Sequence, residues 1–152
     1  MKTATQWLNE YGESHQNPTN IAIHKICVPA IMFSVLGFLW VLKVPGTHGF
    51  INAATLVSIA AVMFYARLSF SLSIGMFAEA GLMLAALWIL EAVFSAPVVL
   101  MSISIFVVAW ILQFVGHKIE GKKPSFFQDL IFLMIGPLWT LSFVYKKLGI
   151  KI

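Results

Sequence analysis

Four long apolar runs follow a polar N-terminal stretch, and their lengths predict membrane-spanning helices. Residues 1–20 are largely polar, whereas Ile21–Leu42, Phe50–Ala66, Leu68–Leu90 and Ala96–Val115 are dominated by apolar side chains. About 20 helical residues, each rising about 1.5 Å, cross the hydrocarbon core of a bilayer. The pattern therefore predicts four transmembrane helices, the second of them somewhat short.

A fifth apolar segment, Phe126–Tyr145, carries Gly136 and Pro137 at its middle. Proline cannot donate a helical hydrogen bond, and its ring clashes with the preceding turn. Two half-helices of about ten residues each suit a re-entrant or interfacial hairpin better than a full crossing, provided that protein covers the exposed backbone. We therefore expect an all-α polytopic membrane helical bundle, with about four transmembrane helices and a broken C-terminal hydrophobic hairpin.

The basic residues support this topology. With four spans, both chain ends lie on one side of the membrane together with nine of the ten Lys and Arg residues, which leaves Lys43 alone on the other side. A straight fifth span would move the last three lysines across and leave six against four. Because basic residues accumulate in cytoplasmic loops, both termini are predicted to be cytoplasmic. The nine residues are Lys2, Lys25, Arg67, Lys118, Lys122, Lys123, Lys146, Lys147 and Lys151.

The composition excludes several classes of protein. Of the 152 residues, 60% are hydrophobic and 11% are charged, and the mean hydropathy is +0.91. Soluble domains carry about 25% charged residues, which argues against a cytosolic enzyme, a disordered chain or a nucleic-acid-binding module. Residues 1–152 are expected to form a single integral membrane domain whose N-terminus is not a cleavable signal peptide. The lone Cys27 forbids an internal disulfide and a Cys-rich metal site.

The first polar cluster surrounds the predicted start of the first span. Asn17 followed by Pro18 is a good helix start, because Asn caps the free amides and proline tolerates the first helical position. From that start, Asn20 and His24 are four residues apart and share one helix face. His15 lies just before the cap. On this segment alone, His24 also suits an interfacial histidine bonded to a carbonyl, and His15 a solvated loop residue.

The second polar cluster follows the fourth span. His117 and Glu120 are three residues apart, so they point the same way on a helix, and Gly116 leaves space for a neighbouring backbone or a ligand. Such a pair can bind a metal ion. The alternative is that Glu120 pairs with Lys122 or Lys123 and His117 caps the end of the span.

The predicted topology brings His15, His24 and His117 to the same face of the membrane. Imidazole suits Fe, Cu, Ni and Zn, and three protein ligands leave positions open for substrate or oxygen. We therefore expect a shared metal site. Further ligands, or acceptors that orient the rings, would come from Glu13, Glu120, Asp129 or Asn20.

Two other polar residues stand apart from these clusters. His48 is predicted on the opposite face, in a glycine-flanked turn, where we expect it to be solvated. Glu79 falls inside the third span, where a carboxylate is costly unless it is protonated, paired or turned towards a cavity. It indicates either a proton path or a neutral acid that faces other helices.

Both clusters resemble those of a known family. The first block is His15-Gln16-Asn17-Pro18-Thr19-Asn20, leading to His24 and Pro29, and the second is Gln113-Phe114-Val115-Gly116-His117, followed by Pro124 and then Gly136-Pro137. In order and over nearly the whole chain, they resemble the family of small multi-pass proteins that includes the yeast endoplasmic-reticulum 2-hydroxy fatty acid dioxygenase, or a bacterial branch of it. The resemblance implies an Fe(II)-dependent dioxygenase of fatty-acid α-oxidation that uses O₂ to remove one carbon from a 2-hydroxy acid.

The resemblance gives the site residues roles. His15, His24 and His117 would hold Fe(II), Glu120 and Asn20 would support the site, and Lys122, with neighbouring lysines, would attract the carboxylate. The acyl tail would lie between the helices, in the bacterial inner membrane or the endoplasmic reticulum, among membrane lipids. Two rival functions stay open, namely a haem-binding membrane electron carrier and a non-catalytic lipid-binding or transport protein that uses Glu79. The oligomeric state is not indicated.

Overall fold

The protein is a bundle of α-helices, as expected. The computed structural model describes residues 2–47, 51–125 and 129–152, and in those ranges β structure is limited to an isolated bridge between Lys43 and Asn52. The helices are α1 (Ala4–Gly12), α2 (Pro18–Trp40), α3 (Ala53–Leu68), α4 (Phe70–Ala92), α5 (Val98–Glu120) and α6 (Phe132–Leu148).

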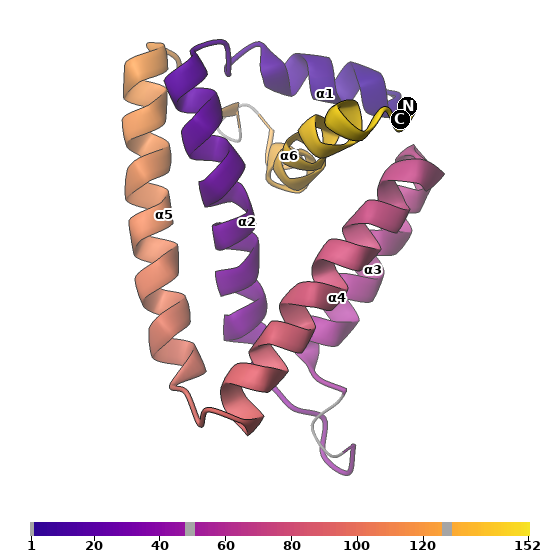
Figure 1. Ribbon diagram of the computed structural model, residues 1–152, viewed down its shortest axis with the longest axis vertical. Helices are drawn as coiled ribbons and strands as arrows, with labels where there is room; N and C mark the ends of the chain where they lie inside the picture. The colour runs from indigo at the N-terminus through magenta and orange to yellow at the C-terminus, as the bar shows by residue number, and fades with distance from the viewer. Residues whose placement is uncertain (1, 48–50, 126–128) are drawn as a thin grey trace.

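Helices α2, α4 and α5 have 23 residues each and are long and apolar enough to cross a membrane. Helix α3 is apolar but has only 16 residues, about 24 Å of helix, in agreement with the short second run. Ser69 ends α3 and caps α4, so these two helices form a tight hairpin. The chain passes four times between the two ends of the molecule, and both termini lie at the same end (Figure 1).

Helices α2 to α5 pack as two pairs. Helix α2 packs along α5, and α3 along α4. The pairs diverge towards the end that carries the termini, where α1 and α6 lie across the opening (Figure 1). We call this the upper end. An upper core at this end consists of Ala4, Leu8, Tyr11, Tyr65, Leu72, Met76, Phe132, Ile135, Leu138, Trp139 and Tyr145. A lower core towards the other end consists of Leu36, Trp40, Ala54, Leu87 and Val98.

Helix α1 forms in the polar N-terminal stretch, where the sequence pattern predicts no element. Thr3 and Gln6 make a reciprocal capping box that satisfies free amides at the start of the helix. Ala4, Leu8 and Tyr11 lie on one helical face and are buried in the upper core. This short amphipathic helix packs on α6 and sets the position of the loop that follows it.

The expected break in the C-terminal segment is wrong. Helix α6 runs without interruption through Gly136 and Pro137, while residues 126–128 of the expected hairpin lie outside the described ranges. Pro137 is the sixth residue of the helix, so its missing amide removes only one hydrogen bond near the start. Burial of Ile135, Leu138 and Trp139 against neighbouring helices outweighs that loss. The helix stays at the upper end beside α1 (Figure 1).

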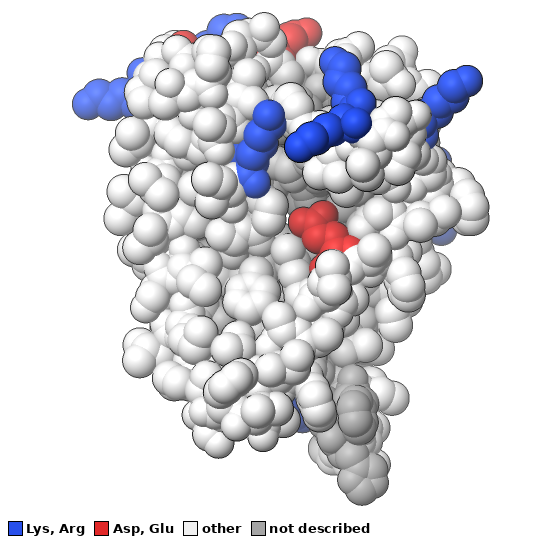
Figure 2. All heavy atoms as spheres, viewed as in Figure 1, with Lys and Arg blue, Asp and Glu red and all other residues white. Residues whose placement is uncertain are grey.

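The basic side chains on the visible face gather at the upper end, where the two termini lie (Figure 2). This distribution agrees with the charge asymmetry expected from four passages. Lys43 lies just after α2, at the other end, where it pairs with Glu91. The side of the membrane that each end faces stays a prediction.

Candidate metal centre

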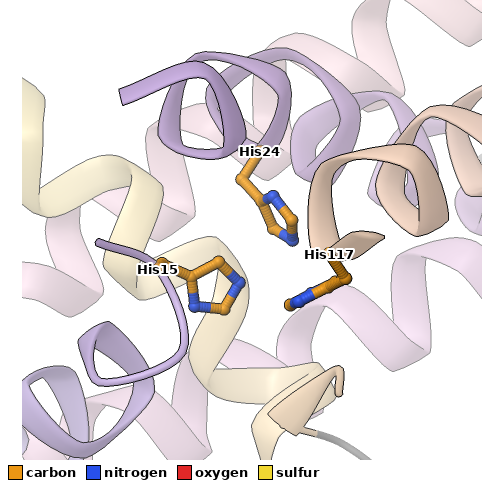
Figure 3. A group of neighbouring side chains, drawn as sticks. All are labelled: His15, His24 and His117. Carbon is orange, nitrogen blue, oxygen red and sulfur yellow. The ribbon is translucent and has the colours of Figure 1, made fainter. Parts of the chain in front are cut away.

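Three histidines from three separate stretches of chain meet at the upper end of α2 and α5 (Figure 3). His15 comes from the loop between α1 and α2, His24 from the second turn of α2, and His117 from the last turn of α5. Their ring centroids are 4.2 Å apart for His15 and His24, 4.9 Å for His15 and His117, and 4.8 Å for His24 and His117. All three side chains are buried.

Local structure fixes two of the rings. Helix α2 starts where the sequence predicts, with the Asn17 side chain accepting from the Thr19 amide at 2.9 Å. The His24 Nδ1–H donates to the Asn20 carbonyl at 3.0 Å, one turn earlier. The His15 Nδ1–H donates to the Tyr11 carbonyl at 2.7 Å. Because carbonyls only accept, both hydrogens lie on Nδ1, and the Nε2 atoms keep their lone pairs.

The free ring nitrogens fit a metal ion. His15 Nε2, His24 Nε2 and His117 Nδ1 are buried and have no hydrogen-bond partner. An unsatisfied buried polar atom costs about 1–3 kcal/mol, so three in one place indicate a missing partner. One nitrogen of each ring lies within 4.8 Å of the others. An ion at their centre would be at most about 2.8 Å from each, so shifts of under about 1 Å reach the 2.0–2.1 Å typical of a metal–imidazole bond.

Burial also keeps His15 in the form that binds metals. Desolvation lowers the pKa of His15 to about 4. The ring is therefore neutral near pH 7, and a neutral imidazole is the form that can act as a ligand.

Two aromatic side chains that no sequence motif indicated as site residues enclose His15. The Tyr11 ring stacks on the imidazole, with centroids 4.3 Å apart and an interplanar angle of 7°. The Trp139 ring lies 5.0 Å from the same imidazole. The four-residue spacing of Tyr11 and His15 was a usable signal once α1 was recognised, whereas only the fold brings Trp139 there.

Glu120 and Asn20 lie beside the histidines and hold the loop that carries His15. The Glu120 carboxylate accepts from the backbone amides of Gln16 at 2.9 Å and Asn17 at 2.8 Å, and from the Asn20 side-chain amide at 3.1 Å. Of the ion pairs between described residues, none joins Glu120 to Lys122 or Lys123. Glu120 thus ties the end of α5 to the start of α2.

The other residues that the sequence suggested as ligands or supports are not grouped with the three rings. Within the part of the chain that the structure describes, Glu13, Glu120 and Asp129 are not part of the metal-competent group. Lys122 is exposed, and its Nζ donates to the Glu13 carbonyl at 2.6 Å. Glu79 is half-buried on α4. The expectation for His48 falls outside the described residues.

A cavity of about 450 Å³ extends from the histidines between α2, α3, α4, α5 and α6. Its volume falls in the range of small-molecule sites, about 300–1,000 Å³. Polar side chains line the end beside the rings, and the remaining wall is almost wholly apolar, which suits an amphiphile with its head at the histidines. The polar lining residues at that end are Tyr11, His24, Gln113, His117 and Ser125. Gln113 and Ser125 were not predicted as site residues.

Comparison with known proteins gives two matches. The sequence model of a family described as "2-hydroxy-palmitic acid dioxygenase Mpo1-like" matches residues 1–148, which include all three histidines. The chain is also 30% identical over 144 residues to the 2-hydroxy-palmitic acid dioxygenase MPO1 of Saccharomyces cerevisiae. That match covers 93% of this chain and 79% of the yeast protein. No solved structure matches the chain.

Proposed function

Because the chain belongs to the 2-hydroxy-palmitic acid dioxygenase Mpo1-like family, we propose that it is a membrane dioxygenase that uses Fe(II) to shorten 2-hydroxy fatty acids by one carbon. One observation carries the proposal beyond the family. Three buried, unpartnered imidazole nitrogens stand at the polar end of a long apolar cavity.

In this proposal His15, His24 and His117 hold the iron. When bound, Fe(II) would supply the redox chemistry between a 2-hydroxy carboxylate and O₂, which a set of only three protein ligands would leave room to approach. The overall reaction balances as R–CHOH–COOH + O₂ giving R–COOH, CO₂ and H₂O. Oxygen accepts all the electrons that the substrate loses, so turnover consumes no other reductant.

The remaining residues bind and orient the substrate. Gln113 and Ser125 line the polar end of the cavity and are placed to hydrogen-bond the carboxylate or the hydroxyl. Asn20 and Glu120 hold the loop of His15 in register with α5. Lys122 and the neighbouring lysines raise the positive potential at this end and attract the anionic head. The apolar wall buries the tail, and each methylene adds about 0.8 kcal/mol.

The packing of the rings supports a bare ion rather than haem. The three ring centroids lie 4.2–4.9 Å from one another in edge-to-face contact. A haem would need a planar slot between two axial histidines, and no pair of these rings leaves such a slot. The lipid-carrier alternative would use Glu79, which does not line the cavity.

Replacing His15, His24 or His117 singly with Ala tests the proposal. Each variant should lose most of its bound iron and stop converting 2-hydroxypalmitate to the acid one carbon shorter, because two imidazoles bind an ion far more weakly than three. Iron is measured by elemental analysis of anaerobically purified protein, and product by mass spectrometry.

His48→Ala is the matched control and should keep both iron and activity. Wild-type iron content in all three site variants would eliminate the site. A Soret band in the purified protein would favour the haem carrier. Loss of function only in Glu79→Gln would favour the lipid carrier.

A further inference from the structure

The cavity has a defined floor where it meets the lower core. Leu36 lines the cavity and also belongs to the lower core. At the next residue, Gly37, α2 approaches α5 so closely that an added Cβ would lie 2.0 Å from Ser102 Oγ and 3.6 Å from Leu87 Cδ2. Helices α2, α4 and α5 therefore meet at this level, and below Leu36 the buried side chains of the lower core occupy the space between the helices.

The depth of the cavity suits a long acyl chain. Its wall on α2 runs from His24 to Leu36, and on α5 from His117 to Phe106. At 1.5 Å per residue these stretches measure about 18 Å and about 16 Å. A lipid acyl chain spans half the thickness of the hydrocarbon core of a bilayer, which is about 15 Å. A chain whose head lies at the histidines would thus end at Leu36.

Small side chains on α3 and α4 keep the lower part of the cavity open. Ser58, Ala61 and Ala80 line it. Ser58 stands one turn above Ala54 of the lower core, and its hydroxyl is buried without a hydrogen-bond partner. A buried hydroxyl in an apolar wall does not stabilise the fold. The small side chain of Ser58 therefore leaves cavity volume at this position and adds little to the packing of the helices.

We propose that Leu36 and Ser58 determine which acyl chain length the protein accepts, Leu36 as the floor and Ser58 as the small residue that leaves room above it. The inference rests on the proposed function, which places the substrate head at the histidines. Each methylene that fits above the floor strengthens binding about fourfold. A methylene beyond the floor gains nothing and must displace Leu36.

Two substitutions should move the preferred chain length in opposite directions. Leu36→Ala removes three side-chain carbon atoms from the floor of the cavity. The preferred acyl chain should therefore become about two methylenes longer. Ser58→Leu fills the lower cavity, removes the unpaired hydroxyl and should shift the optimum at least two methylenes shorter, with undiminished thermal stability. The readout is kcat/KM for saturated 2-hydroxy acids from decanoic to eicosanoic. Leu39→Ala, one turn below in α2 and outside the cavity lining, is the matched control and should not move the optimum.

A second readout separates this inference from the proposed chemistry. The dissociation constants of unsubstituted saturated fatty acids, measured by displacement of a fluorescent fatty acid, should show the same two shifts without any turnover. If no variant oxidises a 2-hydroxy acid but the binding optima shift, the floor is supported and the proposed function fails. If the wild type turns over and neither optimum shifts, or Leu39→Ala shifts it equally, the floor is wrong while the proposed function stands.

Discussion

A single substitution at Glu120 can show whether this residue holds the His15 loop or binds the metal ion. Its carboxylate accepts hydrogen bonds from two backbone amides of the His15 loop and from the Asn20 side chain. A Glu120→Gln side chain has one oxygen and no charge, so at least one of these donors loses its acceptor. We expect the free energy of unfolding to fall by about 1–2 kcal/mol, while the amount of bound iron stays close to that of the wild type. Thermal unfolding and elemental analysis measure the two effects.

Glu13→Gln provides the comparison, because the Glu13 side chain is exposed and makes none of these bonds. It should leave both quantities unchanged. If Glu120→Gln instead loses its iron while its unfolding temperature stays the same, Glu120 is a metal ligand and not a clamp on the loop.

The residues of the site divide into those that the sequence reveals and those that only the fold reveals. His15, His24 and His117 could be grouped because the apolar runs and the basic residues place all three at the same face of the membrane, and Asn17-Pro18 marks the start of the helix that carries His24. Contacts between residues that are far apart in the sequence leave no such local signal. Ser14 and Ser125 have their hydroxyl oxygens 2.5 Å apart although more than a hundred residues separate them.

At the scale of helices, the α2–α5 contact decides whether the site is assembled. Gly116 allows close approach, since an added Cβ would lie 2.4 Å from Asn20 Oδ1. Asn20 cannot move freely, because its side chain is bonded to Glu120 and its carbonyl holds His24. Gly116→Ala should therefore push α2 and α5 apart beside His24 and His117. We expect a destabilisation of about 1–3 kcal/mol together with weaker iron binding in a competition titration with a chelator.

Gly81→Ala on α4 is the matched control. An added Cβ there meets nothing within 4 Å, and alanine favours the helix by about 0.5–1 kcal/mol, so stability should rise slightly and iron binding should not change. Equal behaviour of the two alanine variants would mean that close approach at Gly116 does not matter.

The sequence predicted helices α2 to α5 well and helices α1 and α6 poorly. Helices α2 to α5 follow from continuous apolar runs, which need no knowledge of their neighbours. Helix α1 depends on burial of Ala4, Leu8 and Tyr11 against α6, and α6 tolerates Pro137 only because its flanking residues are packed. A helix that is stabilised by its partners cannot be judged from its own residues alone.

At the scale of the whole molecule, the polar end of the cavity lies towards the end at which the basic side chains gather. Most of the visible basic side chains lie at the upper end (Figure 2). The three histidines lie at the same end, and the apolar cavity runs from them towards the lower core. A fatty acid bound as proposed would have its head at the basic end and its tail towards the interior of the bundle. This is the orientation of a lipid in the adjacent leaflet, so the substrate could enter without turning over.

The four passages of the chain predict that both termini face the same compartment, which labelling can test. In a Cys27→Ser background, Lys2→Cys and Lys151→Cys should react with a membrane-impermeant maleimide from the same side of sealed vesicles, since both positions are exposed at the upper end. Leu42→Cys, exposed at the opposite end just after α2, should react only from the other side. From the excess of Lys and Arg at the upper end we predict that this end faces the cytoplasm. Labelling of the two terminal cysteines from opposite sides would require an odd number of crossings, and the pairing of α3 with α4 as a hairpin in the membrane would then be wrong.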